Sequence, residues 1–231
     1  MTDGFKTIQS VERAMALLEH IAVSGDKARL VDLSEQLQLH KSTVSGLLKT
    51  LLHLGYIERQ GRFYILGLRL HNIAQPLLSR YLSISLQYRS LLETMAEECG
   101  ETCYLAVPCG TSEYLYIDTI ESHSILRVVS PRGLRENLTT SAIGKVFLAF
   151  DIDLLRQLRR SNKVSTVLEA ELENIRQLGY ALDLEQAEVG LNCLAIPLFQ
   201  KGKIYAALGV AGSSLRLNKD KIEEVVKTII K

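Results

Sequence analysis

Apolar residues in the first third of the chain recur at helical spacing in three successive runs. Over residues 7–24 they predict an amphipathic helix that ends at Gly25. Its expected inward stripe is Ile8, Val11, Met15, Leu18 and Ala22. A shorter run covers 32–37, where Asp32 and Glu35 have the spacing of a capping box. A third run begins at Lys41 and predicts a helix with the inward residues Val44, Leu47, Leu48, Leu51 and Leu54.

The second and third runs are joined by a turn of three or four residues, and the third opens with Lys-Ser-Thr. This is the arrangement of a helix-turn-helix, whose second helix can lie in the major groove of DNA. Strand-like runs at 56–60 and 62–65 then flank Gly61 and predict a hairpin with Arg59, Gln60 and Arg62 exposed at its tip. Three helices and a hairpin predict a winged helix over residues 1–67.

The next segment, 68–85, is expected to be a linker helix. Its first part has helical character, Pro76 interrupts or kinks it, and the apolar run continues to residue 85 with little charge. A segment so rich in Leu and Ile is not a flexible tether. We expect it to pack against a second copy of the chain.

Residues 86–231 alternate between helical and strand-like patterns. Helices are expected at 88–99, 141–150, 153–160, 172–178 and 219–230, and strands at 102–107, 113–119, 126–129, 194–199 and 204–211. Strands flanked by helices predict an α+β domain of the kind that senses small molecules. The expected organisation is therefore a winged helix, a linker helix and one effector-binding domain.

Charge and composition exclude some of the functions that the chain could have. The chain has 231 residues and a formal net charge of +1, which excludes a globally basic nucleic-acid coat. Between His40 and Arg62, however, four cations face one acidic residue, a local excess of +3 that would contact phosphates. The alternative interpretation of this face is a solvated surface used for protein contact.

No apolar stretch approaches the length of a membrane span, and the N-terminus lacks the apolar region of a signal peptide. We therefore expect a cytoplasmic protein without a membrane partner, whose four cysteines are reduced.

Several segments, in the same order along nearly the whole chain, resemble the IclR family of bacterial transcription regulators. The winged helix matches at 42–44, 47–51, 54–57 and 64–67, and the effector domain at 100–102, 138–149, 178–185 and 190–197. The resemblance implies a homodimer, or a dimer of dimers, that binds double-stranded operator DNA. It also implies a C-terminal GAF-like mixed α/β domain that binds a small metabolite and thereby changes how the paired winged helices sit on the operator.

The resemblance further implies where the effector binds. Ligand carboxylates would be held by backbone amides at the helix start formed by Ser141, Ala142 and Ile143, and by side chains matching Asp183 and Cys193. A helix N-terminus suits an anion because its amides are free and its dipole is positive there. Asp183 would then have to be protonated or accept from a ligand hydroxyl. Alternatively, Asp183 and Glu185 lie on a solvated edge.

Positions at which this chain differs from the family pattern lead to further predictions. Some relatives have two serines where this chain has Gly209 and Ala211, which predicts a less polar and slightly roomier pocket wall. We therefore expect a small organic acid with an apolar or aromatic body rather than a two-carbon acid. Gly46 replaces a common Arg, so DNA contacts are expected from Lys41, Ser42, Thr43, Ser45 and Lys49 on the helix and from Arg59 and Arg62 on the wing. Gln38 occupies a turn position where Gly is usual.

Three functions remain open from the sequence. The first is an effector-controlled transcriptional repressor of a catabolic operon. The second is a DNA-binding module fused to an enzyme that uses Cys193 as nucleophile or Lys145 as amine, although neither has a partner in the sequence and Lys145 is expected on a helix surface or end. The third is an interaction adaptor that does not bind DNA. We expect no catalytic residue, metal or cofactor, and we expect Tyr104, Tyr114 and Tyr116 to be core or interface residues.

Overall fold

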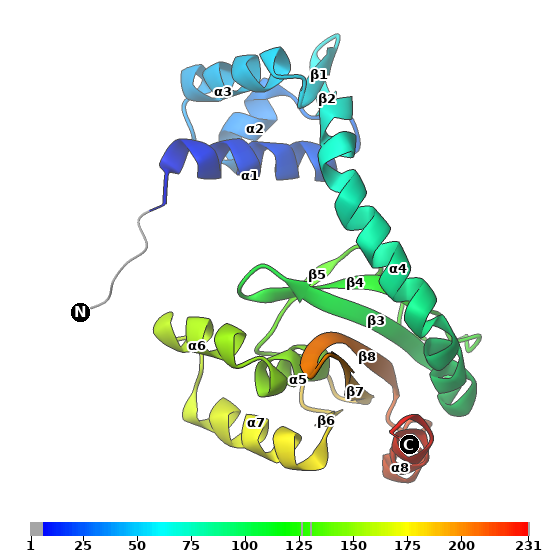
Figure 1. Cartoon of the computed structure of the whole chain (residues 1–231). Coiled ribbons are helices and arrows are strands. Elements are labelled where there is room, and N and C mark those ends of the chain that lie inside the picture. The colour runs from blue at the N-terminus through cyan, green and yellow to red at the C-terminus, as the bar shows by residue number, and fades with distance from the viewer. Residues whose placement is uncertain (1–6, 126, 130, 231) are drawn as a thin grey trace. The chain divides into compact units, whose positions relative to one another are not determined.

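The computed structural model describes residues 7–125, 127–129 and 131–230. The chain divides into two compact units, residues 1–80 and 81–231, and each is described separately. Figure 1 labels the elements along the chain.

The first unit is a winged helix, as the sequence predicts. Its helices are α1 (Gln9–Val23), α2 (Leu30–Gln36) and α3 (Lys41–His53), and the antiparallel hairpin consists of β1 (Ile57–Gln60) and β2 (Phe63–Leu66). A single bridge from Ala28 to Tyr64 adds a third segment to the hairpin. The core is formed by Leu17, Ile21, Ala28, Leu33, Val44, Leu48, Leu51, Ile57 and Tyr64.

The predicted inward stripe of α1 is wrong for four of its five residues, and Leu18 alone among them packs against the core. Ile8, Val11 and Met15 are more than half exposed, and the buried residues of α1 are Leu17 and Ile21. The helix carries apolar residues around most of its circumference, so spacing alone does not select the buried face. The contact with α2, α3 and the hairpin selects it.

Two smaller predictions in this unit also fail. Helix α2 begins at Leu30 rather than Asp32, so no capping box forms, and Asp32 instead accepts hydrogen bonds of 2.7 and 2.8 Å from the Arg29 guanidinium. Leu54, expected inward, is 40% exposed because α3 has ended one residue before it.

Helix α4 (Leu68–Cys99) is one continuous helix of 32 residues that spans the boundary between the two units. Pro76 lies inside it without ending it, and the predicted helices at 68–85 and 88–99 are therefore joined. Although α4 is long, no helix among the described residues is both long and apolar enough to cross a membrane.

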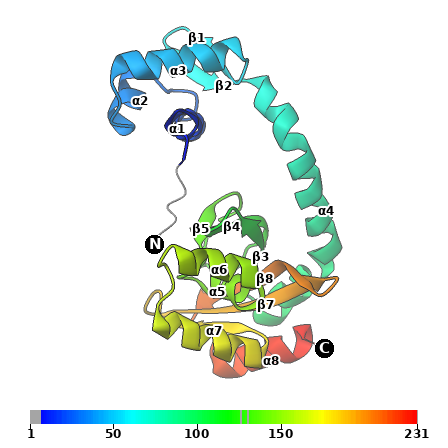
Figure 2. The same ribbon diagram turned by 60° about the vertical axis from the view of Figure 1, so that its left-hand side comes forward.

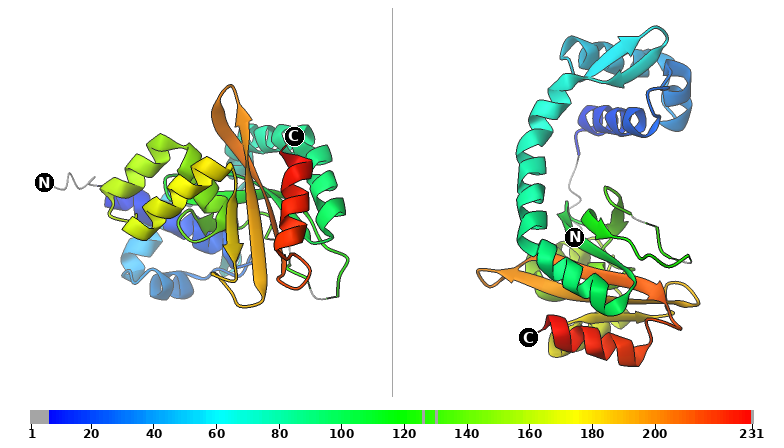
Figure 3. Two further views of the ribbon diagram at one scale, coloured as in Figure 1. Left: turned by 90° about the horizontal axis from the view of Figure 1, so that it is seen from below. Right: turned by 90° about the vertical axis from the view of Figure 1, so that its right-hand side faces the viewer.

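The second unit is built on a six-stranded antiparallel sheet with the order β5-β4-β3-β8-β7-β6. The strands are β3 (Thr102–Cys109), β4 (Glu113–Ile120), β5 (Arg135–Asn137), β6 (Ala181–Leu184), β7 (Leu191–Gln200) and β8 (Lys203–Ser213). The helices are α5 (Ala142–Phe150), α6 (Ile152–Arg160), α7 (Thr166–Leu178) and α8 (Lys219–Ile229). Figure 2 shows α5, α6 and α7 gathered together, and Figure 3 shows α8 beside the C-terminal part of α4.

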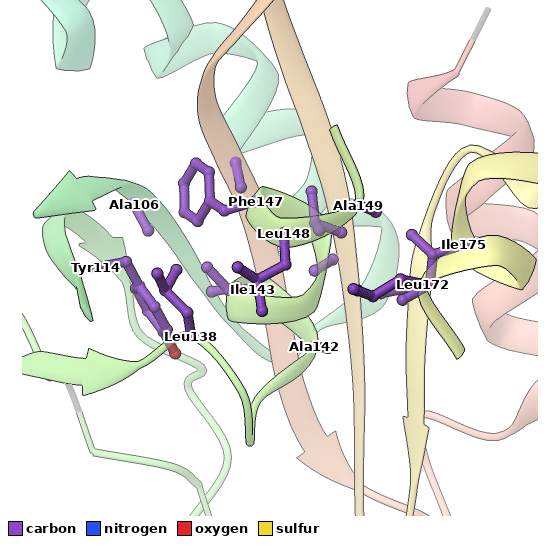
Figure 4. Close-up of a cluster of buried hydrophobic side chains, with 14 of the residues drawn as sticks. Ala106, Tyr114, Leu138, Ala142, Ile143, Phe147, Leu148, Ala149, Leu172 and Ile175 are labelled. Atoms are coloured by element: carbon purple, nitrogen blue, oxygen red, sulfur yellow. The ribbon is translucent and has the colours of Figure 1, made fainter. Parts of the chain in front are cut away.

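The two faces of this sheet differ in side-chain size. The face toward α8 and the end of α4 carries Leu105, Val107, Ile196, Leu208 and Val210. The face toward α5 carries the smaller Ala106, Ala181, Ala195, Ala207 and Ala211, together with tyrosines. Small residues let α5, which is buried on nearly every side, lie close to the sheet. Figure 4 shows Ile143 and Leu138 beside the Tyr114 ring, with Leu172 and Ile175 of α7 beyond α5.

The sheet departs from the predicted strands at its edges. Of the strand expected at 126–129, Leu126 lies outside the described residues, and 127–129 form no strand. The edge strand is instead β5, an exposed three-residue segment without apolar side chains that the pattern gave no reason to expect. Strand β6 was also not predicted, and α7 begins at Thr166, six residues before the predicted start, because the Ser165 hydroxyl caps it by accepting from Leu168 N.

Candidate functional sites

The residues expected to contact DNA lie along one side of α3. Lys41, Ser42 and Lys49 are exposed, while Thr43 and Ser45 are half-buried. The opposite side of α3 is buried in the core through Val44, Leu48 and Leu51. The helix therefore has a polar, basic face that is free of the core, as a recognition helix requires.

The turn before α3 forms although it contains Gln38 at a position where glycine is usual. Gln38 has a φ of +52°, a left-handed conformation that favours glycine. Ser34 secures the turn, because its hydroxyl donates to the Leu39 carbonyl at 2.6 Å and its carbonyl accepts from Leu39 N at 3.0 Å. Gln38 thus occupies a left-handed position where the family usually has glycine, and the hydrogen bonds of Ser34 hold the turn.

The wing arginines are exposed at the hairpin tip, where the sequence places them. Arg59 Nε donates to the Gly61 carbonyl at 2.9 Å, and its guanidinium lies 5.9 Å from the Tyr64 ring centre. Arg62 lies 5.0 Å from the centre of the Phe63 ring. These contacts orient both guanidinium groups on the wing while leaving them accessible to a phosphate.

The second unit contains a cavity of about 450 Å³ between the start of α5 and the sheet. All seven residues expected at the effector site line it: Ser141, Ala142, Ile143, Asp183, Cys193, Gly209 and Ala211. The strand register explains their convergence, because Asp183 pairs with Cys193, and Cys193 pairs with Ala211 across neighbouring strands.

The start of α5 forms one end of this cavity. Ser141 caps the helix, with its hydroxyl accepting from Gly144 N at 3.1 Å. The amides of Ala142 and Ile143 belong to the first turn, where a helix offers no internal acceptor. A Cβ on Gly144 would lie 2.4 Å from the Leu138 carbonyl oxygen, so glycine is required for the approach of this segment to the helix. The arrangement presents amide hydrogens to an anion.

A cluster of tyrosines and a glutamate lines the cavity next to the start of α5, and sequence reasoning did not assign it to the site. Tyr114 donates to Glu136 Oε2 at 2.5 Å and Tyr116 donates to the same oxygen at 3.0 Å. The Tyr114 hydroxyl also lies 2.8 Å from Ser141 Oγ and 2.9 Å from the Tyr116 hydroxyl. The signal in the sequence was the alternation of Tyr114 and Tyr116, which places both on one face of β4.

Tyr104 completes this wall from β3, with its ring centre 5.3 Å from that of Tyr116. Its hydroxyl is buried and has no hydrogen-bond partner among the described residues. Burial raises the pKa of Tyr104, Tyr114 and Tyr116 above the usual tyrosine value. All three hydroxyls therefore stay protonated at neutral pH and can donate. They are core residues, as expected, and they also line the cavity.

Asp183 and Cys193 are held within the cavity wall. Asp183 Oδ1 accepts from the backbone amides of Gln186 at 2.8 Å and Ala187 at 3.2 Å, which fixes the carboxylate. Asp183 is buried, whereas Glu185 is exposed, so the two carboxylates do not form a pair facing the site. Burial, followed by the nearby Asp183 and Glu136, raises the pKa of Cys193 to about 12. Cys193 is therefore a neutral thiol at physiological pH.

The expected extra room at Gly209 is not present. A Cβ at this position would lie 2.4 Å from Ile143 Cδ1 and 2.8 Å from its Cγ1. The Ile143 side chain thus fills the volume that a serine would use. The wall is less polar there, as predicted, but it is not roomier at that point.

The residues considered for an enzyme are arranged differently from what covalent catalysis needs. Lys145 is buried rather than on the helix surface, and its Nζ pairs with Glu171 at 2.8 Å. Cys193 is protonated, and all four cysteines are free thiols. Within the described residues no group of three or more His, Cys, Asp or Glu side chains could hold a metal ion.

Comparisons with known proteins agree with this architecture. The family described as "IclR helix-turn-helix domain" matches residues 10–61, and "Bacterial transcriptional regulator IclR C-terminal" matches residues 78–231. The chain is 30% identical to the HTH-type transcriptional regulator KdgR of Escherichia coli K12, covering 95% of this chain and 88% of KdgR. It is also 30% identical to the HTH-type transcriptional repressor AllR of the same strain, covering 94% and 84%.

Solved structures share the fold. The IclR of Thermotoga maritima has a TM-score of 0.64 and 26% identity, covering 97% of this chain and 95% of that one. An IclR homologue from Microbacterium hydrocarbonoxydans, solved with 4-hydroxybenzoate, has a TM-score of 0.72 and 20% identity, covering 96% of each chain. With both domains matched in order along nearly its whole length, this chain belongs to the IclR family of DNA-binding bacterial transcription regulators.

Proposed function

We propose that this regulator is a repressor of a catabolic operon, and that a small organic acid bound in the second unit controls its affinity for operator DNA. The observation that carries the effector half of the proposal is the cavity of about 450 Å³, which opens onto the amides at the start of α5. Its volume falls within the range of roughly 300–1,000 Å³ that is typical of small-molecule sites.

The DNA half of the proposal uses the exposed face of α3 and the wing. Lys41, Ser42, Thr43, Ser45 and Lys49 would contact the major groove and its phosphates, and Arg59 and Arg62 would contact the flanking backbone. Base contacts from so few residues favour a palindromic operator read by two copies of the chain. We therefore propose a homodimer or a dimer of dimers acting in the cytoplasm.

Exposed apolar side chains on α4 support the homodimer. Leu68, Ile73, Leu78, Leu82 and Leu86 are each more than half exposed, an uncommon surface for a helix that faces only water. A second copy of the chain would cover them. This proposal keeps 68–85 as the dimer-forming linker and assigns DNA binding to 1–67 and effector binding to 86–231.

The relatives support an acid as the effector class. The Microbacterium neighbour was solved with 4-hydroxybenzoate, an aromatic acid, and its fold matches this chain along 96% of the length. Here the wall facing the α5 amides is largely tyrosine, valine and alanine, which suits an apolar or aromatic body. The chain's own residues would orient the acid at the helix start and exclude water around its body.

We do not propose catalysis. A neutral, buried Cys193 is a poor nucleophile, and the Nζ of Lys145 is engaged by Glu171 at 2.8 Å. We therefore expect that neither Cys193→Ala nor Lys145→Ala removes an enzymatic activity. The adaptor alternative makes a different prediction, because its partner binding does not depend on the cations of α3.

Gel retardation with the DNA upstream of the chain's own gene tests the proposal. The double variant Lys41→Ala with Lys49→Ala should lose most operator binding, and each phosphate contact removed should lower the salt slope by about 0.9 per copy. The matched control is Lys163→Ala with Lys201→Ala, two exposed cations of the second unit. Operator binding retained by the α3 variant would overturn the assignment of the DNA contacts to these lysines, and no operator binding by the unmodified protein would favour the adaptor.

A further inference from the structure

The charge of the effector cavity conflicts with a simple acid as ligand. Two carboxylates, Glu136 and Asp183, line it, and the described lining residues include no Lys, Arg or His. The amides at the start of α5 are the groups suited to an anion. A ligand carboxylate placed there therefore meets negative charge and no positive side chain.

Glu136 lies close to that anion position. Its Oε2 is joined through the Tyr114 hydroxyl to Ser141 Oγ, the α5 cap, by hydrogen bonds of 2.5 and 2.8 Å. Two like charges at such a separation repel each other, although solvent weakens the repulsion because Glu136 is exposed. An acid is accommodated only when another group on the same ligand compensates this repulsion.

The hydrogen bonds of Glu136 leave an acceptor for that group. Both tyrosine hydroxyls donate to Oε2, and Oε1 has no donor among the described residues. Because Glu136 is exposed and lines the cavity, Oε1 is an acceptor available to a ligand group that donates a hydrogen bond. Such a bond would replace repulsion by attraction at this end of the cavity.

Tyr104 supplies an independent observation that a ligand group is missing. Tyr104 lines the cavity and is only 4% exposed, and its buried hydroxyl has no partner in the part of the chain that is described. Buried hydroxyls without partners are rare, because losing water without replacing its hydrogen bond is unfavourable. Its proton requires an acceptor.

A hydroxyl group satisfies both requirements. It donates to Glu136 and accepts from Tyr104, whereas an ammonium group only donates and leaves the Tyr104 proton unpaired. An unsubstituted acid does neither. The short path from Glu136 to the start of α5 places the hydroxyl near the ligand carboxylate.

We propose that the effector is a 2-hydroxy acid, and that Glu136 and Tyr104 determine this specificity. The carboxylate binds the amides of Ala142 and Ile143, the hydroxyl lies between Glu136 and Tyr104, and the remaining body of the ligand lies along the apolar wall. This inference rests on the proposed function, since it refines the class of acid bound at the same cavity.

Matched pairs of acids test the inference on the full-length protein. Phenylacetate and mandelate differ by one hydroxyl, as do 3-phenylpropionate and 3-phenyllactate, and phenylalanine carries an ammonium in its place. Calorimetric titration should show the hydroxy acid binding at least about tenfold more tightly than its partner. Phenylalanine should bind more weakly than 3-phenyllactate.

Two variants assign the preference to the residues. In Glu136→Gln the repulsion is removed, so the unsubstituted acid should gain affinity and the ratio within each pair should fall to about threefold or less. In Tyr104→Phe the hydroxy acid should lose affinity and the unsubstituted acid should not. The matched control is Glu113→Gln, whose carboxylate pairs with Arg135 at 3.5 Å and does not line the cavity, and it should keep the wild-type ratio.

The outcomes separate this inference from the proposed function. Equal binding of both members of each pair to the wild type, or an unchanged ratio in Glu136→Gln, would overturn the inference and leave an acid effector standing. Tighter binding of phenylalanine would also overturn it in favour of an amino acid. Binding of no acid to any of these proteins would overturn both, while gel retardation would report on DNA binding independently.

Discussion

Replacement of Gly209 by alanine should destabilise the second unit through one side chain, Ile143. The added Cβ would lie 2.4 Å from Ile143 Cδ1 and 2.8 Å from Cγ1, whereas carbon atoms in contact are about 3.5–4.0 Å apart. Ile143 is 95% buried beside Tyr114 and Leu138, so it has little room to move. Overpacking of this kind costs about 1–3 kcal/mol.

A double-mutant cycle isolates this contact. Ile143→Ala removes both clashing atoms and should itself cost about 2–5 kcal/mol, because it leaves a cavity. In that background the added cost of Gly209→Ala should fall below about 0.5 kcal/mol, giving a coupling of about 0.5–3 kcal/mol. Urea unfolding followed by circular dichroism measures each term. Equal costs of Gly209→Ala in the two backgrounds would refute the reasoning, since the clash with Ile143 would then not be its cause.

Other predictions follow from single positions. Gly46→Ala, where a Cβ on α3 meets no atom within 4 Å, should stabilise the first unit by up to about 1 kcal/mol in thermal unfolding; destabilisation would mean that the helix needs glycine there. Gln38→Gly should stabilise the same unit by about 0.5–1 kcal/mol because φ is +52°, whereas a loss of stability would show that the turn favours glutamine. Because folding raises the pKa of Cys193 to about 12, the folded state holds this proton more tightly, and stability should fall as pH rises from about 9 towards 12. Cys193→Ala should decline less steeply over that window in urea unfolding, and parallel curves would contradict the assignment.

The recognition helix shows how much local pattern determines. In α3 the apolar spacing alone separated the buried Val44, Leu48 and Leu51 from the exposed Lys41 and Lys49. The hairpin turn at Gly61 was equally local. Both depend on residues a few positions apart in the chain, which is the range that periodicity reports.

Helix α1 shows where such reasoning stops. Its apolar residues cover more than one face, so the choice of Leu17 and Ile21 over Val11 and Met15 depends on which surface the rest of the unit offers. Strand β5 is a similar case, since a short polar segment becomes a strand only because the edge of β4 is available to pair with it.

The residues of the effector cavity fall into the same two groups, those found from the sequence and those found only in the structure. Family likeness located Ser141, Ala142, Ile143, Asp183 and Cys193, and the structure brings them to one cavity from α5, β6 and β7. The link from Tyr114 and Tyr116 to Glu136 spans about twenty residues of sequence, and no spacing rule connects them. The filling of the space above Gly209 by Ile143 is likewise a contact between separate elements.

The sequence by itself determined the order of the domains and the helices and hairpin of the winged helix, because each depends on residues near one another in the chain. Family likeness added the helix start that is proposed to bind an acid. The tertiary structure alone decided which face of α1 is buried, which side chains wall the cavity and which carboxylate lies beside the anion position. Those features depend on distances between segments far apart in the sequence, and only folding sets them.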